Sequence, residues 1–272
     1  MADKVMFITG ASSGIGLATV KYFVEKGWKV AATMRNPNAV PELLNIQRVK
    51  TYALDVTNRA TVISVVQSVI HDFKKIDVVI NNAGYGAIGP FEGANEEQLF
   101  AQMNTNFFGT TRIIAAFLPH FKSNGGGTFI NLSSIAGRMA MPLYSIYHAS
   151  KYAVEGFTES LSYELRSFNI RVRLVEPGPI KTEFNGRSRV DLVPSDFSNY
   201  KDFVEKIDGF YGAAFKRAED VSVVVKTIYR AAICKSYKLR FPAGIQAKAL
   251  LLFNKVLPSR WLRWLVRKTM RI

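Results

Sequence analysis

Short apolar runs alternate with longer helical patterns along most of this chain, and this alternation limits the folds it can adopt. The runs are continuously apolar, which is typical of strands buried on both faces of a sheet. They predict strands at Val5–Thr9, Lys29–Thr33, Val49–Ala53, Asp77–Ile80, Thr128–Leu132, Arg171–Val175 and Lys238–Phe241. The segments between them predict helices at Gly14–Lys26, Arg59–Phe73, Glu96–Phe121, Ser145–Phe168 and Asp220–Ile233. Strand–helix–strand units join parallel strands by right-handed crossovers, so we expect a single-domain α/β fold with a doubly wound parallel sheet.

One segment interrupts this alternation. Residues 184–217 have no clean period, and we expect a helical lid over a binding site at the carboxyl ends of the strands. The lid contains seven aromatic residues: Phe184, Phe197, Tyr200, Phe203, Phe210, Tyr211 and Phe215. They favour a lipophilic substrate, unless they only pack the lid onto the body. An acidic group on the substrate would meet the basic residues of the lid: Arg187, Arg189, Lys201, Lys206, Lys216 and Arg217.

Basic residues are concentrated near the end of the chain. The protein has 36 Lys and Arg against 21 Asp and Glu, a net charge of +15, yet no acidic residue follows Asp220. The last 52 residues contain twelve of the basic residues and carry +12, whereas the first 220 carry 24 − 21 = +3. A nearly neutral body with a basic tail makes the tail the candidate for contact with an anionic surface.

The sequence offers little for cross-links, metals or membrane spans. Its one cysteine, Cys234, cannot form an internal disulfide, and its three histidines are far apart, so we expect no metal site. No apolar run approaches the ~20 residues of a membrane span. The N-terminal residues enter the first predicted strand too soon for a signal peptide. We therefore predict a cytoplasmic protein, with the tail as the part suited to peripheral membrane contact.

A glycine-rich turn joins the first predicted strand to the first helix, with the sequence Thr9-Gly10-Ala11-Ser12-Ser13-Gly14-Ile15-Gly16. Small residues let the backbone approach a pyrophosphate, and the helix N-terminus offers N–H groups and the positive end of its dipole. The turn therefore predicts a dinucleotide site. The alternative is a tight strand–helix connection that binds no ligand.

Tyr147 and Lys151 lie four residues apart in a predicted helix, and therefore on one face of it. A tyrosine pKa near 10 is too high for a base at neutral pH, and a nearby ammonium would lower it. Ser134, at the end of a predicted strand, offers a hydroxyl to a substrate oxygen. The alternatives are an ordinary surface pair for the first motif and a cap or turn for the serine. His148 points away from its neighbour's target, so we expect a structural role for it.

Together these motifs resemble the short-chain dehydrogenase/reductase family. The matching pieces occur in the family's order: Thr9-Gly10…Gly14-Ile15-Gly16, Asp55-Val56, Asn81-Asn82-Ala83-Gly84, Asn106 in Asn-Phe-Phe-Gly, Ser134, Tyr147, Lys151 and Pro177-Gly178-Pro179-Ile180-Lys181-Thr182. The resemblance implies a Rossmann-type domain over residues 1–241. The basic amphipathic extension over residues 242–272 lies beyond the family's motifs and is predicted from its charge and helical pattern. Residues 31–37 and 176–184 resemble the hydroxysteroid and retinol dehydrogenase-like branch, which also contains acyl-dihydroxyacetone-phosphate reductases.

The resemblance also implies roles for individual residues. In the implied catalytic set, Tyr147 would exchange a proton with the substrate oxygen, which Ser134 would orient. Lys151 would lower the pKa of Tyr147 and bind the nicotinamide ribose. Asn106 would hold a water that links Lys151 to solvent, unless it is only a packing amide at a helix kink. The implied cofactor-binding residues are Gly10, Ser12, Ser13, Gly14, Ile15, Gly16, Arg35, Asp55, Val56, Asn82, Ala83, Gly84, Tyr147, Lys151, Pro177, Gly178, Ile180 and Thr182.

Cofactor choice depends on the end of the second predicted strand. A carboxylate there would bind the ribose of NAD, but none lies between Gly27 and Pro41, whereas Arg35 suits the 2′-phosphate of NADP. NADP(H) is therefore favoured over NAD(H), unless Arg35 is only a solvated surface residue. We predict hydride transfer between NADP(H) and a lipophilic carbonyl or alcohol of the steroid, retinoid or acyl-ketone type. The alternatives are a catalytically idle dinucleotide-binding regulator and a membrane-surface scaffold.

The tail predicts two helices split by Pro258, with Ser259 capping the second. The second helix carries basic and tryptophan residues at helical spacing: Arg260, Arg263, Arg267, Arg271, Trp261 and Trp264. This composition is typical of helices at an anionic membrane interface. The alternatives are a subunit contact and a cover over the substrate pocket, and we expect no nucleic acid partner. We also expect a homo-oligomer, either a dimer or a tetramer.

Overall fold

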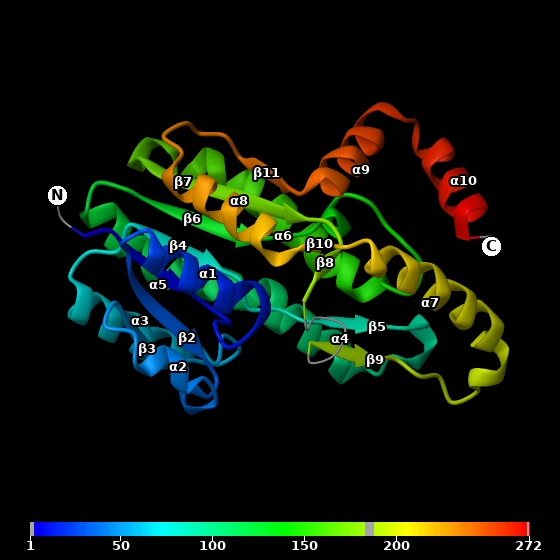
Figure 1. Cartoon of the computed structure of the whole chain (residues 1–272), viewed down its shortest axis with the longest axis horizontal. Helices are drawn as coiled ribbons and strands as arrows, with labels where there is room; N and C mark the ends of the chain where they lie inside the picture. Colours follow the sequence, from blue (N-terminus) through cyan, green and yellow to red (C-terminus); the bar gives the residue numbers. More distant parts are fainter. Residues whose placement is uncertain (1–2, 183–187, 271) are drawn as a thin grey trace.

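Seven parallel strands form the central sheet of the computed structural model, which describes residues 3–182, 188–270 and 272 (Figure 1). Along the sheet the order is β11-β7-β6-β4-β1-β2-β3. The strands are β1 Val5–Ile8, β2 Lys29–Met34, β3 Val49–Ala53, β4 Val78–Asn81, β6 Gly127–Leu132, β7 Ile170–Pro177 and β11 Arg240–Ala243. The order reverses between β1 and β4, so the topological switch point lies there. All seven predicted strands are confirmed, with ends that differ by up to two residues.

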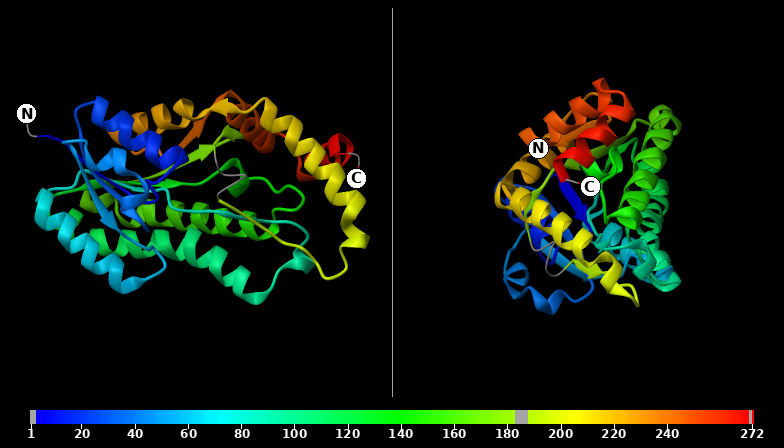
Figure 2. Two further views of the ribbon diagram at one scale, coloured as in Figure 1. Left: turned by 60° about the horizontal axis from the view of Figure 1, so that its bottom comes forward. Right: turned by 90° about the vertical axis from the view of Figure 1, so that its right-hand side faces the viewer.

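Helices cover both faces of the sheet, in three layers (Figure 2). One face is covered by α1 Gly14–Glu25, the short α2 Pro41–Leu44 and α8 Val221–Ile233, the other by α3 Arg59–Phe73, α5 Gly109–Ser123 and α6 Ser145–Glu164. Adjacent residues of β1 point to opposite layers: Met6 and Ile8 pack with α1 and α8, and Phe7 packs with α3 and α5. A strand such as β1 is apolar at every position because a layer of helices packs on each of its two faces. This confirms the doubly wound arrangement.

The prediction of one continuous helix over Glu96–Phe121 is wrong. It is divided into α4 Glu96–Met103, a π-helical turn Asn104–Phe108 and α5. The widened turn directs the side chain of Asn106 inward, where its amide donates to the carbonyl of Tyr85 and the hydroxyl of Ser150, each at 3.0 Å. Partners this distant in sequence leave no periodic signal.

The described part of the lid contains a regular helix, α7 Lys201–Lys216, where the sequence shows no clean period. Ile207 is fully buried, and Phe203 and Phe210 pack beside it at helical spacing. Phe184 and Arg187 lie outside the described residues. Two short parallel pairs were not predicted, because strands of two or three residues carry no pattern: β5 Gly86–Ile88 with β9 Arg189–Asp191, and β8 Ile180–Lys181 with β10 Glu219–Asp220.

The tail forms α9 Ile245–Val256 and α10 Ser259–Met270, separated at Pro258 as predicted. The carbonyl of Pro258, rather than the side chain of Ser259, begins the second helix by accepting from the N–H groups of Trp261 and Leu262. Strand β11 continues to Ala243, two residues past the expected domain boundary. Both helices and α7 lie beyond the carboxyl ends of the strands (Figure 1). Among the described helices, none combines the length and apolar character needed to cross a bilayer. Arg271 lies outside the described residues.

Candidate active site

The glycine-rich turn is packed against the end of β4. The Nδ2 atom of Asn82 donates to the carbonyls of Thr9 and Gly10, at 2.9 and 3.0 Å. The backbone N–H groups of Asn82 and Ala83 both donate to the hydroxyl of Thr9 at 3.0 Å. A Cβ atom on Gly16 would lie 2.1 Å from the carbonyl oxygen of Gly10. Gly16 is therefore required for the close approach of helix and turn.

The N-terminus of α1 fits a bound phosphate. Its N-cap residue, Ser13, forms no side-chain capping bond, and its first turn has no acidic residue. Gly14 has a φ of +51°, and the nearest atom to a Cβ placed there would be the Cβ of Thr182, 3.8 Å away. The turn residue Ser12 and the first helical residues thus border an open cradle at the positive end of the helix dipole. This is the fit that a dinucleotide pyrophosphate requires.

Arg35 follows β2 directly and is exposed. The N–H of Ala11 donates to the carbonyl of Thr33 at 3.0 Å, so the glycine-rich turn lies beside the end of β2. Arg35 therefore lies in sequence two residues beyond the strand position that contacts the turn, at the end of β2 where the 2′-phosphate of NADP is expected.

Asp55 and Val56 follow β3. The carboxylate of Asp55 accepts from the N–H and hydroxyl of Thr57, at 2.8 and 2.7 Å. The N-cap of α3 is Asn58, which accepts from the N–H groups of the first turn. Asp55 is therefore not the cap of this helix. Val56 is buried and packs against the backbone of Gly109, where a Cβ would lie 2.7 Å from its side chain.

Tyr147 and Ser134 are brought together by α6 and the end of β6. Tyr147 is buried, and burial raises the pKa of its hydroxyl above the usual range. A hydrogen bond with Ser134 lowers the pKa of Tyr147, but by less than burial raises it. The Ser134 hydroxyl also accepts from the N–H of Ala136 at 3.1 Å and donates to the carbonyl of Pro177 at 3.4 Å. The serine is thus held in one position beside the tyrosine.

Lys151 lies on the same face of α6. Its Nζ donates to the carbonyl of Leu132 at 2.8 Å and lies 5.7 Å from the centroid of the Tyr147 ring. Burial lowers the pKa of Lys151 to about 8, and the negative charge of Glu155 opposes this shift. The expected lowering of the Tyr147 pKa by Lys151 is absent from this structure. The reason is that desolvation of the phenol dominates and the ammonium is directed to a backbone carbonyl.

Asn106 lies close to this pair. A Cβ atom on Gly84 would lie 3.0 Å from the Oδ1 of Asn106 and 3.9 Å from the Nζ of Lys151. The Oδ1 accepts from the N–H of Tyr85 at 3.1 Å, and the amide nitrogen is bonded as described above. These contacts are those of a packing amide. The water relay through Asn106 stays a prediction.

The end of β7 completes the cofactor side. Pro177 is the last residue of the strand, and its carbonyl accepts from Ser134. Gly178 packs against the backbone of Ala247 in α9, and Ile180 is buried. The predicted residues of this segment therefore lie at the same edge of the sheet as the glycine-rich turn.

His148 has the structural role that was predicted. Its Nε2 accepts from the N–H of Met141 at 2.9 Å, and its Nδ1 lies 2.7 Å from the carbonyl oxygen of Ala136. Burial lowers the pKa of His148, which favours the neutral ring. The imidazole thus fastens the loop that follows Ser134.

A buried ionic network behind the site was not predicted. Glu176, which is 1% exposed, has its Oε1 3.4 Å from Arg138 and 3.5 Å from Arg240. Glu155 lies 3.2 Å from the same Arg240. Burial, then the negative charge of Glu155, raises the pKa of Glu176 to about 7 against the opposing effect of the two arginines. The signal available in the sequence was the position of Glu155, four residues after Lys151 and therefore on the same face of the predicted helix.

An apolar cluster surrounds Tyr147 on the substrate side. Its other buried members come from four places in the chain. Ile88 lies in β5, Ile207 in α7 and Met270 in α10, and the segment that precedes α6 contributes Ala136, Leu143 and Tyr144. Phe203, Phe210, Tyr211 and Val266 pack against them. The lid and the second tail helix therefore contribute side chains to one apolar cluster that includes Tyr147.

A family model described as short chain dehydrogenase matches residues 4–192. The chain belongs to the short-chain dehydrogenase/reductase family. It is 40% identical over 202 residues to the 3-ketodihydrosphingosine reductase of Bacteroides thetaiotaomicron, covering 74% of this chain and 73% of that protein. A short-chain dehydrogenase from Streptomyces avermitilis has a similar structure, with 28% identity, a TM-score of 0.85 and coverage of 98% and 96% of the two chains. A Burkholderia cenocepacia member in complex with NADP has 28% identity, a TM-score of 0.76 and coverage of 96% and 95%.

Proposed function

We propose that this family member is an NADP(H)-dependent oxidoreductase that reduces a lipophilic ketone or aldehyde, or oxidises the corresponding alcohol. The observation that carries the proposal is the buried Tyr147 hydroxyl, bonded to Ser134 inside an apolar cluster. Such a site combines a proton donor, an oxygen-orienting hydroxyl and apolar surroundings. An idle regulator would have no need of this arrangement.

The cofactor proposal is supported by the cradle at α1 and by Arg35. The cradle suits a pyrophosphate, and Arg35 suits the additional phosphate of NADP(H) through charge-assisted hydrogen bonds. The Burkholderia cenocepacia structure was determined with NADP. When bound, the nicotinamide supplies or accepts the hydride.

The residues of the chain handle the proton and the orientation. Because burial holds the pKa of Tyr147 high, its hydroxyl is protonated at neutral pH and is ready to donate to a carbonyl oxygen. Ser134 orients the same oxygen. Lys151, whose pKa is about 8, carries a proton that exchanges near neutrality, next to the tyrosine ring. The protonated form of Tyr147 is the one that the reduction of a carbonyl requires.

The substrate proposal rests on the apolar cluster. Aromatic and aliphatic side chains from α7 and α10 suit a long-chain, steroid or retinoid ketone. The relative from Bacteroides thetaiotaomicron is named for a long-chain ketone, which supports the first class.

The test combines a substrate screen with one substitution. Sterol, retinoid and long-chain acyl ketones are offered with NADPH, and turnover is followed by NADPH absorbance. Tyr147→Phe keeps the ring but removes the proton donor, so turnover should fall by about 10²–10⁴-fold, while NADPH binding, measured by fluorescence titration, should persist.

Tyr163→Phe is the matched control, because it removes an exposed hydroxyl from the same helix. This control should keep full turnover. Wild-type turnover in Tyr147→Phe would refute the mechanism. NADPH binding without turnover of any ketone would favour the regulator.

A further inference from the structure

Helix α9 presents an apolar face to solvent. Ile245, Leu252, Phe253 and Val256 are each more than half exposed, and their spacing of seven, eight and eleven residues from Ile245 places them on one side of the helix. The opposite side is anchored to the body: Ala247 is buried, and the amide of Asn254 donates to the carbonyl of Arg138 at 2.9 Å. Surface helices of water-soluble proteins normally show the reverse pattern.

Helix α10 is divided in the same way. Leu262, Val266 and Met270 face inward at helical spacing, and Val266 and Met270 join the apolar cluster around Tyr147. Trp261 and Trp264 are half-exposed, and their rings pack edge to face with centroids 6.1 Å apart. Covering the substrate site accounts for the inward residues only. The two tryptophans need another explanation.

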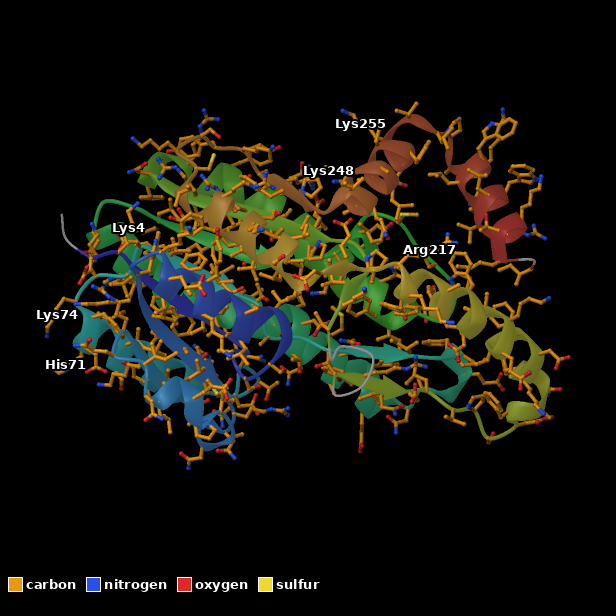
Figure 3. The ribbon with its side chains drawn as sticks, in the orientation of Figure 1. Lys4, His71, Lys74, Arg217, Lys248 and Lys255 are labelled. Carbon is orange, nitrogen blue, oxygen red and sulfur yellow. The ribbon has the colours of Figure 1, made fainter. Side chains whose placement is uncertain are left out.

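The charges around these apolar residues have one sign. The cations of the two helices are Lys248, Lys255, Arg260, Arg263, Arg267 and Lys268, and no acidic residue occurs in this part of the sequence. Four of them line a shallow groove on α10 together with Trp264. The Nζ of Lys268 lies 4.8 Å from the centroid of the Trp264 ring. Figure 3 shows that Lys248 and Lys255 project from α9 at the corner of the molecule that also carries α10.

We propose that the outer surface of α9 and α10, defined by the exposed apolar residues and cations named above, docks on an anionic phospholipid bilayer. Tryptophans prefer the boundary between head groups and acyl chains, aliphatic side chains are buried just below it, and arginine and lysine bind the lipid phosphates. The inner face of α10 would then hold the substrate site against the bilayer. Docking does not depend on the reaction proposed above.

A second copy of the chain suits this surface poorly. In a two-fold dimer the same patch meets itself, so six cations of one subunit would face six of the other without a carboxylate among them. A nucleic acid would meet the cations but would leave the apolar face of α9 without a partner. A bilayer with anionic lipids satisfies both features.

The test uses the full-length protein and its own tryptophans. Of the three tryptophans, Trp28 is buried in the core, so changes in emission report on Trp261 and Trp264. Vesicles of phosphatidylglycerol and phosphatidylcholine should shift the emission to shorter wavelength and sediment the protein, and phosphatidylcholine alone should do neither. High salt should reverse the binding, because the Debye length falls to about 3 Å at 1 M salt.

Charge reversal supplies the decisive comparison. Each cation near an anionic surface contributes about fivefold in affinity, so Arg260→Glu, Arg263→Glu and Arg267→Glu together should weaken vesicle binding by at least about 100-fold. The matched control reverses Lys4, Lys26 and Lys74, which are exposed and distant from the tail; Figure 3 labels Lys4 and Lys74 at the opposite end. Both triple variants lower the net charge from +15 to +9. The control should bind as the wild type does.

Three results would overturn the proposal. The first is wild-type protein that binds neither vesicle. The second is equal binding by the two triple variants, which would reduce the effect to net charge. The third is a stable dimer, seen by sedimentation velocity, that the Arg260, Arg263 and Arg267 reversals dissociate, because the surface would then be a subunit contact.

Discussion

Glu176→Gln should change how the stability of the protein depends on pH. The glutamate is almost fully buried at the end of β7, between Arg138 and Arg240 and next to the negative charge of Glu155. In the folded protein its pKa is raised from 4.5 to about 7. Glutamine has nearly the same shape and does not titrate, so the substitution isolates the contribution of this one proton.

The magnitude and sign follow from proton linkage. Between pH 4.5 and about 7 the folded state keeps the proton of Glu176, whereas the unfolded state releases it, so the free energy of unfolding falls as pH rises through this window. A difference of about 2.5 pKa units at 1.36 kcal/mol each corresponds to a loss of about 3 kcal/mol. Glu176→Gln removes this loss, so its stability relative to wild type should rise by about that amount across the window.

Urea denaturation followed by far-UV circular dichroism, at pH values on both sides of this window, measures the effect. Glu97→Gln is the matched control, because Glu97 is exposed on α4, and its curve should run parallel to that of the wild type. If Glu176→Gln also ran parallel to the wild type, the carboxyl would not retain its proton in the folded state. The account of the buried network would then be wrong.

Two further substitutions test the cofactor side, and a third tests the N-cap of α3. Arg35→Asp should weaken NADP(H) binding by about 10- to 100-fold, the value of one lost charge-assisted bond, with NAD(H) binding unchanged or tighter; an unchanged ratio of the two dissociation constants would exclude Arg35 from the site. Gly16→Ala should abolish NADPH binding in fluorescence titrations and lower the melting temperature, because its Cβ would lie 2.1 Å from a carbonyl oxygen of the turn; normal binding would contradict the close approach. Asn58→Ala should cost about 1 kcal/mol in urea denaturation and leave NADPH binding intact, and lost binding would show that its role exceeds capping.

The sequence was sufficient for the sheet because its central strands, such as β1 and β4, are buried at every position. Runs such as Val5–Ile8 are apolar at every position, as is typical of strands in the core of a layered α/β fold. The glycine-rich turn was equally legible, since close packing at Gly10 and Gly16 excludes other residues. These features depend on local chemistry and on one-dimensional pattern.

The features that were missed depend on contacts between distant segments. The π-helical turn at Asn106 is stabilised by Tyr85 and Ser150, which no local period reveals. The raised pKa of Tyr147 comes from burial under elements that are far apart in the sequence, so helical spacing to Lys151 gave the opposite sign. Helix α7 was obscured because aromatic residues also occur in the segment before its apolar stripe.

The cofactor side and the substrate side of the site differ in how freely their residues can be substituted. The dinucleotide side is made of strand ends fastened to each other, as in the bonds between Asn82 and the Thr9–Gly10 backbone. The substrate side is made of α7 and α10, which lie outside the sheet and add side chains such as Ile207 and Met270. Substitutions in these two helices can therefore accumulate without disturbing the turns that hold the cofactor. In such a molecule, a new substrate preference can evolve through changes in α7 and α10, while the residues at the strand ends are inherited unchanged.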